Sequence, residues 1–184
     1  MVKQKKEIKA EIELPEGITF GTNEGIVNVK GKAGEISKKM FNPTINISKN
    51  GNNIIIKASR STKRERKLVN TFRAHIKNML KGANEPYKYV LKICSGHFPM
   101  NVSIKGDELI VKNFFGEKMP RILRIKSGAN VKIEGDLITV ESPNKELASQ
   151  VAADIEKLTI RTKYDTRIFQ DGIWIIDKAG KAIR

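Results

Sequence analysis

The sequence predicts an α+β protein made of two tandem, duplicated domains, each a mostly antiparallel β-sheet with one helix packed on a face. Three observations predict it. Short segments of alternating apolar and polar residues dominate the chain, two longer segments have helical spacing instead, and this order of patterns occurs twice. Strands followed by a single helix favour an antiparallel sheet that the helix covers on one side.

The strand segments have a period of two. From Ile8 to Leu14, apolar residues alternate with charged ones, and the same alternation occurs near residues 27–29, 45–47, 102–104 and 131–133. Gly- and Asn-rich stretches separate these segments at residues 21–25, 31–34, 50–53, 106–107 and 135–136. Such stretches are typical of tight hairpin turns, so we expect neighbouring strands to pair antiparallel.

Two segments have apolar residues at helical spacing. The first extends from Thr62 to Gly82, where Thr62 and Glu65 could form a capping box and Gly82 suits the C-cap. The second extends from Ser142 to about Leu158, with Ser142 as the expected N-cap and a proline at the first helical position.

The repeat divides the chain. Residues 29–35 resemble residues 111–117, and residues 53–59 resemble residues 136–142, after which each half enters its helix. Two copies of this length indicate a duplicated domain and not a solenoid. We therefore predict a first domain at residues 1–83 with a basic N-terminal arm, and a second at residues 84–184 with a basic C-terminal extension.

Charge indicates the class of partner. The chain has 35 Lys and Arg against 20 Asp and Glu, a net charge of +15. A surplus of this size favours a polyanionic partner, and we expect nucleic acid in preference to an anionic membrane surface. Apolar runs are strand-sized, so no membrane span is expected. A single cysteine and no apolar leader after Met1 predict a cytoplasmic protein.

The sequence gives little sign of catalysis. The compact candidate is Cys94 to His97, but a thiol ending an apolar strand is usually structural, and no acidic residue that could orient His97 is evident nearby. Cys94, His75 and His97 are too few for a metal site. Residues 31–34 lack the ending of a phosphate-binding loop and suit a hairpin turn. We expect no cofactor, no metal and no enzymatic activity.

Basic residues form several groups. They crowd the N-terminal arm (Lys3, Lys5, Lys6 and Lys9) and the first helix start (Lys63, Arg64, Arg66 and Lys67), where positive charge opposes the helix dipole unless an anion compensates or the side chains point into water. In the second half, aromatic residues are interleaved with the charges. Exposed rings there could stack on RNA bases, although aromatic side chains are more often core.

Three segments of the second half resemble a known family. They are residues 96–102 (Gly-His-Phe-Pro-Met-Asn-Val), 113–118 (Asn-Phe-Phe-Gly-Glu-Lys) and 167–173 (Arg-Ile-Phe-Gln-Asp-Gly-Ile). With them, nearly the whole chain resembles the large-subunit ribosomal protein six family, called nine in eukaryotes, in its archaeal and eukaryotic branch. Trp174 and Phe115 depart from the family's usual residues, and the bacterial Tyr-Lys-Gly-Lys-Gly tail is missing.

The resemblance implies a ribosomal location. Members of the family bind large-subunit ribosomal RNA near the sarcin-ricin loop, beside the stalk base, neighbouring ribosomal proteins and the site where translational GTPase factors dock. Their second domain and C-terminal extension hold most of the RNA. The matching positions, with the interleaved charges and rings, give the candidate RNA-binding residues: His97, Phe98, Lys112, Phe115, Lys118, Arg121, Arg161, Lys163, Arg167, Phe169, Gln170, Lys178 and Lys181.

Two other hypotheses remain open from the sequence. One is a nucleic-acid-binding module outside the ribosome. The other is an enzyme that acts on RNA through Cys94 and His97.

Overall fold

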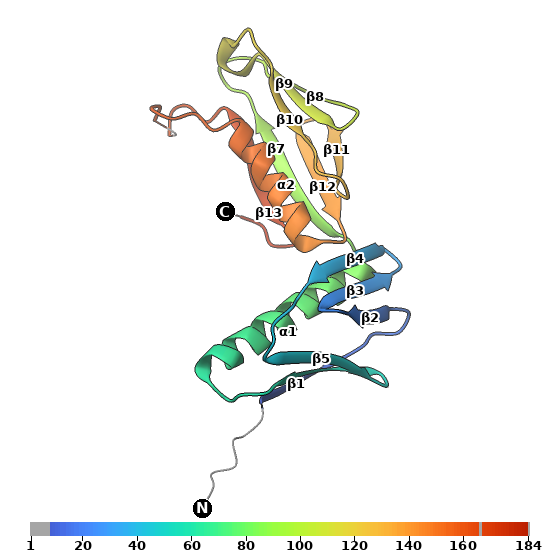
Figure 1. Cartoon of the computed structure of the whole chain (residues 1–184). Coiled ribbons are helices and arrows are strands. Elements are labelled where there is room, and N and C mark those ends of the chain that lie inside the picture. The colour runs from blue at the N-terminus through green and yellow to red at the C-terminus, as the bar shows by residue number, and fades with distance from the viewer. Residues whose placement is uncertain (1–7, 166, 184) are drawn as a thin grey trace, which may run out of the picture. The chain divides into compact units, whose positions relative to one another are not determined.

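A computed structural model describes residues 8–165 and 167–183 of the chain. The chain forms two compact units, Met1–Pro86 and Tyr87–Arg184. Within the described residues each unit contains one α-helix, and all strand pairs are antiparallel (Figure 1). The predicted α+β class with two duplicated domains is confirmed, with one difference. Each unit has two sheets and not one.

From residue 8 onward, the first unit contains six strands and a helix. They are β1 (Ile8–Glu13), β2 (Thr19–Asn23), β3 (Ile26–Gly31), β4 (Gly34–Lys39), β5 (Ile45–Asn50), β6 (Asn53–Ala58) and α1 (Lys63–Asn84). One sheet has the order β1-β6-β5 and the other the order β2-β3-β4. Helix α1 packs on β1 and β6 of the first sheet and on β3 and β4 of the second. The core lies between the helix and the two sheets.

The second unit repeats this plan and adds a strand. Its elements are β7 (Tyr87–Cys94), β8 (Asn101–Lys105), β9 (Glu108–Lys112), the 3-10 turn η1 (Phe114–Gly116), β10 (Arg121–Arg124), β11 (Asn130–Glu134), β12 (Leu137–Ser142), α2 (Lys145–Leu158) and β13 (Gly172–Lys178). The sheets have the orders β11-β12-β7-β13 and β10-β9-β8. Strand β13 has no counterpart in the first unit's described residues.

The hairpin turns fix how the two units correspond. Gly51 and Asn52 connect β5 to β6, while Gly135 and Asp136 connect β11 to β12, so these two turns are equivalent. Ile54 therefore corresponds to Ile138, and both are fully buried. This shifts the correspondence that the sequence suggested between residues 53–59 and 136–142 by one position. The burial pattern decides the register, because a one-residue slip would turn each core side chain outward.

The helix caps differ from those predicted. Helix α1 continues through Gly82 to Asn84, and Glu85 is the C-cap, because Pro86 holds the preceding residue in an extended conformation. The Thr62 hydroxyl donates to the Glu65 carboxylate, but Thr62 makes no side-chain hydrogen bond to the helix backbone. Thr62 is nevertheless the N-cap residue.

The N-cap of helix α2 lies two residues after the predicted one. Asn144 is the N-cap, and its Oδ1 accepts hydrogen bonds from the backbone of Glu146 at 3.0 Å and of Leu147 at 3.5 Å. Ser142 instead ends β12, where its hydroxyl donates to the carbonyl of Gly128 at 2.8 Å. The predicted role of Ser142 is therefore wrong, because the strand continues through it.

The glycine-rich stretch at residues 31–34 is a hairpin turn, as expected. Gly31 lies against helix α1 so closely that a Cβ atom there would be 2.4 Å from the carbonyl oxygen of Ala83. The Ala33 amide donates to that oxygen at 2.9 Å. The glycine is needed for this close approach and not for phosphate binding. Neither described helix is long and apolar enough to cross a membrane.

Candidate nucleic-acid interface

Three segments of the second unit meet at one end of its longer sheet. They are the loop after β7, the turn η1, and the segment between α2 and β13, which Figure 1 shows as an extended loop. Each contributes rings to what we call the aromatic cluster: His97, Phe115, Tyr164 and Phe169. The same segments contain the three motifs that carry the family resemblance.

The rings of the aromatic cluster contact one another in a continuous group. Phe169 lies 5.0 Å from His97, 5.2 Å from Tyr164 and 6.0 Å from Phe115, measured between ring centroids. Tyr164 is exposed, Phe115 and Phe169 are half-buried, and His97 keeps 42% of its side chain exposed. The cluster therefore presents ring faces and edges to solvent while its members support one another.

Arg161 adds a positive charge to the cluster. Its guanidinium lies 4.8 Å from the centre of the Phe115 ring and 4.3 Å from that of Tyr164. A guanidinium stacked on aromatic rings keeps its in-plane N–H groups available as donors. This arrangement suits a phosphate or a base edge next to the rings.

The turn η1 sends one phenylalanine inward and the next outward. Phe114 is 2% exposed and belongs to the core, whereas Phe115 joins the aromatic cluster. The chain achieves this with left-handed backbone at Asn113, Phe115 and Gly116, whose φ angles are 58°, 50° and 74°. The Asn113 side-chain amide donates to the carbonyl of Pro99 at 2.9 Å and ties the turn to the β7 loop.

Asp171 holds the loop that carries His97. Its carboxylate accepts a hydrogen bond from the Gly96 amide, one at 3.2 Å from the His97 amide, and bonds His97 Nδ1 at 2.8 Å. Burial acts to raise the pKa of Asp171, but these hydrogen bonds outweigh it and hold the pKa below its ordinary value. His97 therefore has an acidic partner that was not evident near it in the sequence, because Asp171 lies 74 residues further along the chain.

Arg121 is used within the fold. Its guanidinium lies 4.4 Å from the centre of the Phe114 ring, forms two hydrogen bonds with Glu117 at 2.7 and 2.8 Å, and donates to the carbonyl of Leu158 at 2.7 Å. The hydrogen bond from Arg121 is the main reason that the pKa of Glu117 is lowered. Arg121 thus fastens β10 to the end of α2.

The other candidates are distributed unevenly. Phe98, Lys112, Lys118, Lys163, Arg167 and Gln170 are exposed and belong to the segments around the aromatic cluster, although Arg167 also pairs with Asp165 at 3.0 Å. Lys178 and Lys181 lie at the other end of β13, where Lys178 pairs with Tyr89. A seven-residue strand separates them from the cluster by about 20 Å.

Sequence reasoning missed three residues of this region: Tyr164, Asp171 and Asn113. Tyr164 carried a usable signal, since it is an aromatic residue between charged residues of the tail. Asp171 and Asn113 lie within the quoted motifs, but their partners are far away in sequence. No local pattern identifies such pairs.

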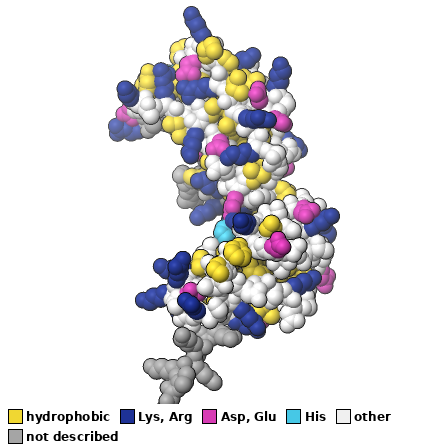
Figure 2. All heavy atoms as spheres, in the orientation of Figure 1, with side chains coloured by type: hydrophobic (Ala, Val, Ile, Leu, Met, Phe, Trp, Pro, Cys, Tyr) yellow, Lys and Arg dark blue, Asp and Glu magenta, His cyan; other side chains and the backbone are white. Residues whose placement is uncertain are grey.

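The basic groups outside this region are less organised. Lys63, Arg64, Arg66 and Lys67 are exposed at the start of α1. Lys3, Lys5 and Lys6 of the predicted arm lie outside the described residues. Lys9 pairs with Glu11 on β1. Figure 2 shows Lys and Arg side chains spread over the visible face of both units, without one dominant patch.

Cys94 and His97, the residues that the sequence offered for catalysis, lie at the end of β7 and in the loop after it. Cys94 is half-buried and pairs with Gly172 in the β7–β13 ladder, and no hydrogen bond joins it to His97. No group of three or more His, Cys, Asp or Glu side chains among the described residues could hold a metal ion.

Comparisons with known proteins agree with the resemblance. The family model described as Ribosomal protein L6 matches residues 14–85 and 98–172. The chain is 45% identical to a large ribosomal subunit protein uL6 of Nanoarchaeum equitans, with 96% of each chain covered. It is 40% identical to a protein of the same name from Methanococcus vannielii, with 96% of this chain and 97% of that protein covered. The chain therefore belongs to the ribosomal protein L6 family.

Proposed function

We propose that this chain is a structural, non-catalytic constituent of the large ribosomal subunit and binds large-subunit ribosomal RNA through the second unit. Family membership and the names of the archaeal relatives support the first part. The observation that carries the second part is the convergence of three distant segments on one group of rings with Arg161 stacked against it.

The proposed mechanism is passive. Rings of the aromatic cluster stack on unpaired bases, while Arg161 and the exposed cations nearby, Lys163 above all, neutralise phosphates. Asp171 and Arg121 act as positioning residues, because one holds the His97 loop and the other fastens β10 to α2. Lys178 and Lys181 would contact a separate stretch of RNA.

The proposed address is the neighbourhood of the sarcin-ricin loop and the stalk base of a cytoplasmic ribosome. There the chain would adjoin other ribosomal proteins and the docking site of translational GTPase factors. The three family motifs support this address, since the segments that contain them are those that meet around the aromatic cluster.

A salt-dependent filter-binding titration tests the interface. The RNA is a large-subunit fragment that contains the sarcin-ricin loop, and the variant combines Arg161→Gln with Lys163→Gln. Each lost phosphate contact should reduce the slope of log K against log salt by about 1, so the double variant should lose about 2.

The matched control combines Lys105→Gln with Lys132→Gln, which removes two exposed charges from β8 and β11. Equal slope losses in the two double variants would contradict the proposed site. A third variant, Lys178→Gln with Lys181→Gln, decides whether the interface extends along β13. A loss of slope comparable to that of the Arg161 and Lys163 variant would mean that the interface extends along β13. An unchanged slope would mean that the interface is confined to the end with the aromatic cluster.

The enzyme hypothesis now has one observation in its favour, the His97–Asp171 pair. A nucleophile must also lie within reach of the imidazole, and Cys94 forms no hydrogen bond with it. Subunits assembled with Cys94→Ala should therefore support factor-dependent GTP hydrolysis at the wild-type rate. Co-sedimentation with large subunits after a high-salt wash separates the ribosomal proposal from a free nucleic-acid-binding module.

A further inference from the structure

The two units differ at one edge of their longer sheets. In the second unit, β7 pairs with β12 on one side and with β13 on the other. In the first unit the equivalent strand, β1, pairs with β6 alone among residues 8–165 and 167–183. The equivalence follows from the ladders, since Ile12 faces Ile54 as Leu91 faces Ile138.

The backbone of β1 is oriented for pairing at this second edge. Leu14 donates to the carbonyl of Asn52 at 2.9 Å, so the amides and carbonyls of alternate residues before it, Ile12 among them, also face β6. The backbone amides and carbonyls of Lys9, Glu11 and Glu13 therefore point away from β6, toward the unpaired edge of β1. In β7 the equivalent groups are used, as when the Lys88 carbonyl accepts from the Ala179 amide at 3.0 Å.

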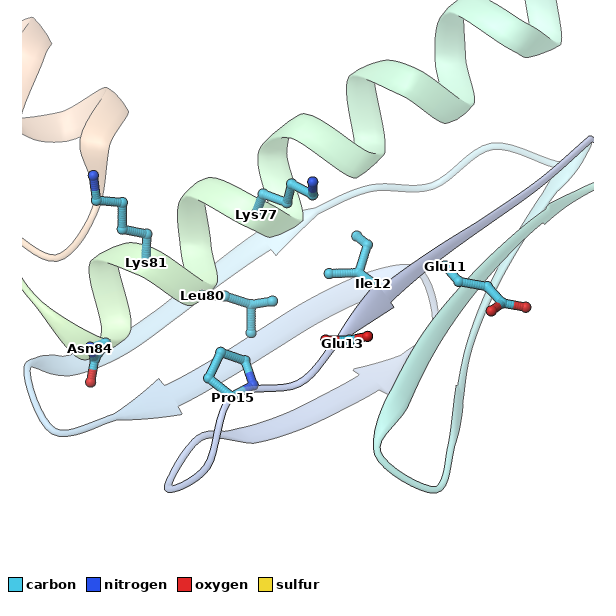
Figure 3. Close-up of a pocket in the computed structure, with 8 residues that line it drawn as sticks. All are labelled: Glu11, Ile12, Glu13, Pro15, Lys77, Leu80, Lys81 and Asn84. Carbon is cyan, nitrogen blue, oxygen red and sulfur yellow. The ribbon is translucent and has the colours of Figure 1, made fainter.

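A hollow lies beside this edge, between β1 and the C-terminal half of α1 (Figure 3). Its volume is about 470 Å³, and it is lined by Glu11, Ile12, Glu13, Pro15, Lys77, Leu80, Lys81 and Asn84. Ile12 and Leu80 point into the space between strand and helix. In the second unit, β13 occupies the corresponding position, where its Ile173 and Ile175 amides bond to Thr159 and Glu156 near the end of α2.

We propose that the free edge of β1 accepts an extended peptide segment of another protein, which pairs with β1 as β13 pairs with β7. Main-chain hydrogen bonds to Glu11 and Glu13 would hold the segment, and alternate side chains would point at Ile12 and Leu80. The occupant's inner residues are therefore apolar. Its outer residues are basic, because that face of β1 exposes two carboxylates, Glu11 and Glu13, against the single cation Lys9, which pairs with Glu11. Opposite charges across strands attract.

Amide hydrogen exchange on the full chain tests whether the edge is open. In the free protein the amides of Glu11 and Glu13 should exchange much faster than those of Ala10 and Ile12, since only the latter bond to β6. Equal protection of both sets would overturn the proposal, because the edge would then already be filled.

A nonapeptide of alternating lysine and valine, blocked at both ends, is the probe for pairing. It should slow exchange at the Glu11 and Glu13 amides. The same peptide N-methylated at alternate residues keeps its charge and apolar groups but cannot donate to the edge, so it should bind roughly tenfold more weakly. Equal binding of the two peptides would overturn the proposal.

Glu11→Pro is the variant of choice. Its amide faces the free edge, so proline removes no bond to β6 and is tolerated on an edge strand. It should weaken binding of the lysine–valine peptide by roughly tenfold. If circular dichroism shows that this variant is unfolded, Glu11→Lys with Glu13→Lys replaces it and should prefer a glutamate–valine peptide. If this folded double variant still preferred the lysine–valine peptide, as the wild type is expected to do, the proposed site would be wrong.

A photo-cross-linking residue at position 11 identifies the occupant in assembled large subunits. A cross-link to an extended segment with alternating basic and apolar residues supports the proposal. Cross-links to RNA alone, to a second copy of this chain, or to nothing would refute it. This last experiment rests on the proposed ribosomal function, whereas peptide binding does not, so the two proposals can fail separately.

Discussion

The two units share one plan but differ at the outer edge of one pair of equivalent strands, β1 and β7. In the second unit β13 covers the edge of β7, and the segment that leads into β13 carries Arg161, Tyr164 and Phe169 to the aromatic cluster. In the first unit no described strand covers β1, and a hollow lies there instead. A single added strand thus completes a sheet and also brings the segment with Arg161, Tyr164 and Phe169, our proposed RNA contact, into place.

The difference between the units depends on β13 being part of the hydrophobic core of the second unit. Ile173 is fully buried, so Ile173→Ala should lower the free energy of unfolding of the second unit by about 2–5 kcal/mol. The fluorescence of Trp174, the chain's single tryptophan, reports unfolding of this unit in urea. Ile176→Ala is the control, because Ile176 is 36% exposed and its loss should cost only about 1 kcal/mol.

The same result determines how RNA binding can be tested. Deleting the tail from Arg161 onward would remove β13 with its buried Ile173, so weaker RNA binding could reflect unfolding alone. Point substitutions at the aromatic cluster avoid this. If Ile173→Ala and Ile176→Ala proved equally mild, the deletion would become a clean experiment.

A second test asks whether RNA distinguishes a ring of the aromatic cluster from an exposed ring of the first unit. Phe169→Ala removes a ring from the aromatic cluster and should weaken RNA affinity by about 1–3 kcal/mol, the usual contribution of a stacked base. Phe41→Ala is the matched control in the first unit, where Phe41 is 66% exposed. We expect its affinity to remain wild-type in the filter-binding titration. Equal losses would mean that RNA does not distinguish the units.

Because of the Asp171 carboxylate, we expect the free energy of unfolding of the second unit to depend on pH. Because its pKa is lowered in the folded state, its contribution is present above its ordinary value of 3.8 and is lost as pH falls through the folded value. Asp171→Asn should lower the free energy of unfolding by about 1–3 kcal/mol near neutral pH, since hydrogen bonds from Gly96 and His97 weaken.

Urea unfolding at a series of pH values provides the measurement. The difference between wild type and Asp171→Asn should be constant above about pH 5 and shrink below about pH 4. A difference that persists unchanged at acid pH would mean that the charge of Asp171 contributes nothing to holding the His97 loop.

The sequence predicted what local patterns determine. Alternation located the strands, and Gly-Asp pairs such as Gly106-Asp107 located hairpin turns, because both depend on neighbouring residues. The duplicated plan was also readable. Strand β13 was not separated from the basic tail, since its burial depends on pairing with β7, about 80 residues earlier in the chain.

The site was predictable in composition but not in arrangement. Basic and aromatic residues indicated nucleic acid, yet the sequence placed Arg161 and Lys181 in one tail, while the structure separates them along β13. Arg121 illustrates the same limit, because its use within the fold depends on the distant Leu158 carbonyl. Charge can be counted from sequence, whereas the partner of each charge is a tertiary property.

The smallest expected effect on stability concerns the N-cap residues of α1 and α2. Asn144 accepts hydrogen bonds from the α2 backbone, so Asn144→Ala should lower the free energy of unfolding of the second unit by about 1 kcal/mol. Thr62 makes no such bond in the first unit, but its hydroxyl donates to the buried Glu65 carboxylate, so Thr62→Ala should cost about 0.5 kcal/mol, less than Asn144→Ala. Trp174 fluorescence measures the stability of Asn144→Ala, and hydrogen exchange of the α1 amides measures that of Thr62→Ala. Equal losses would contradict this ranking, because they would mean that the bond from Thr62 to Glu65 stabilises α1 as much as the Asn144 cap stabilises α2.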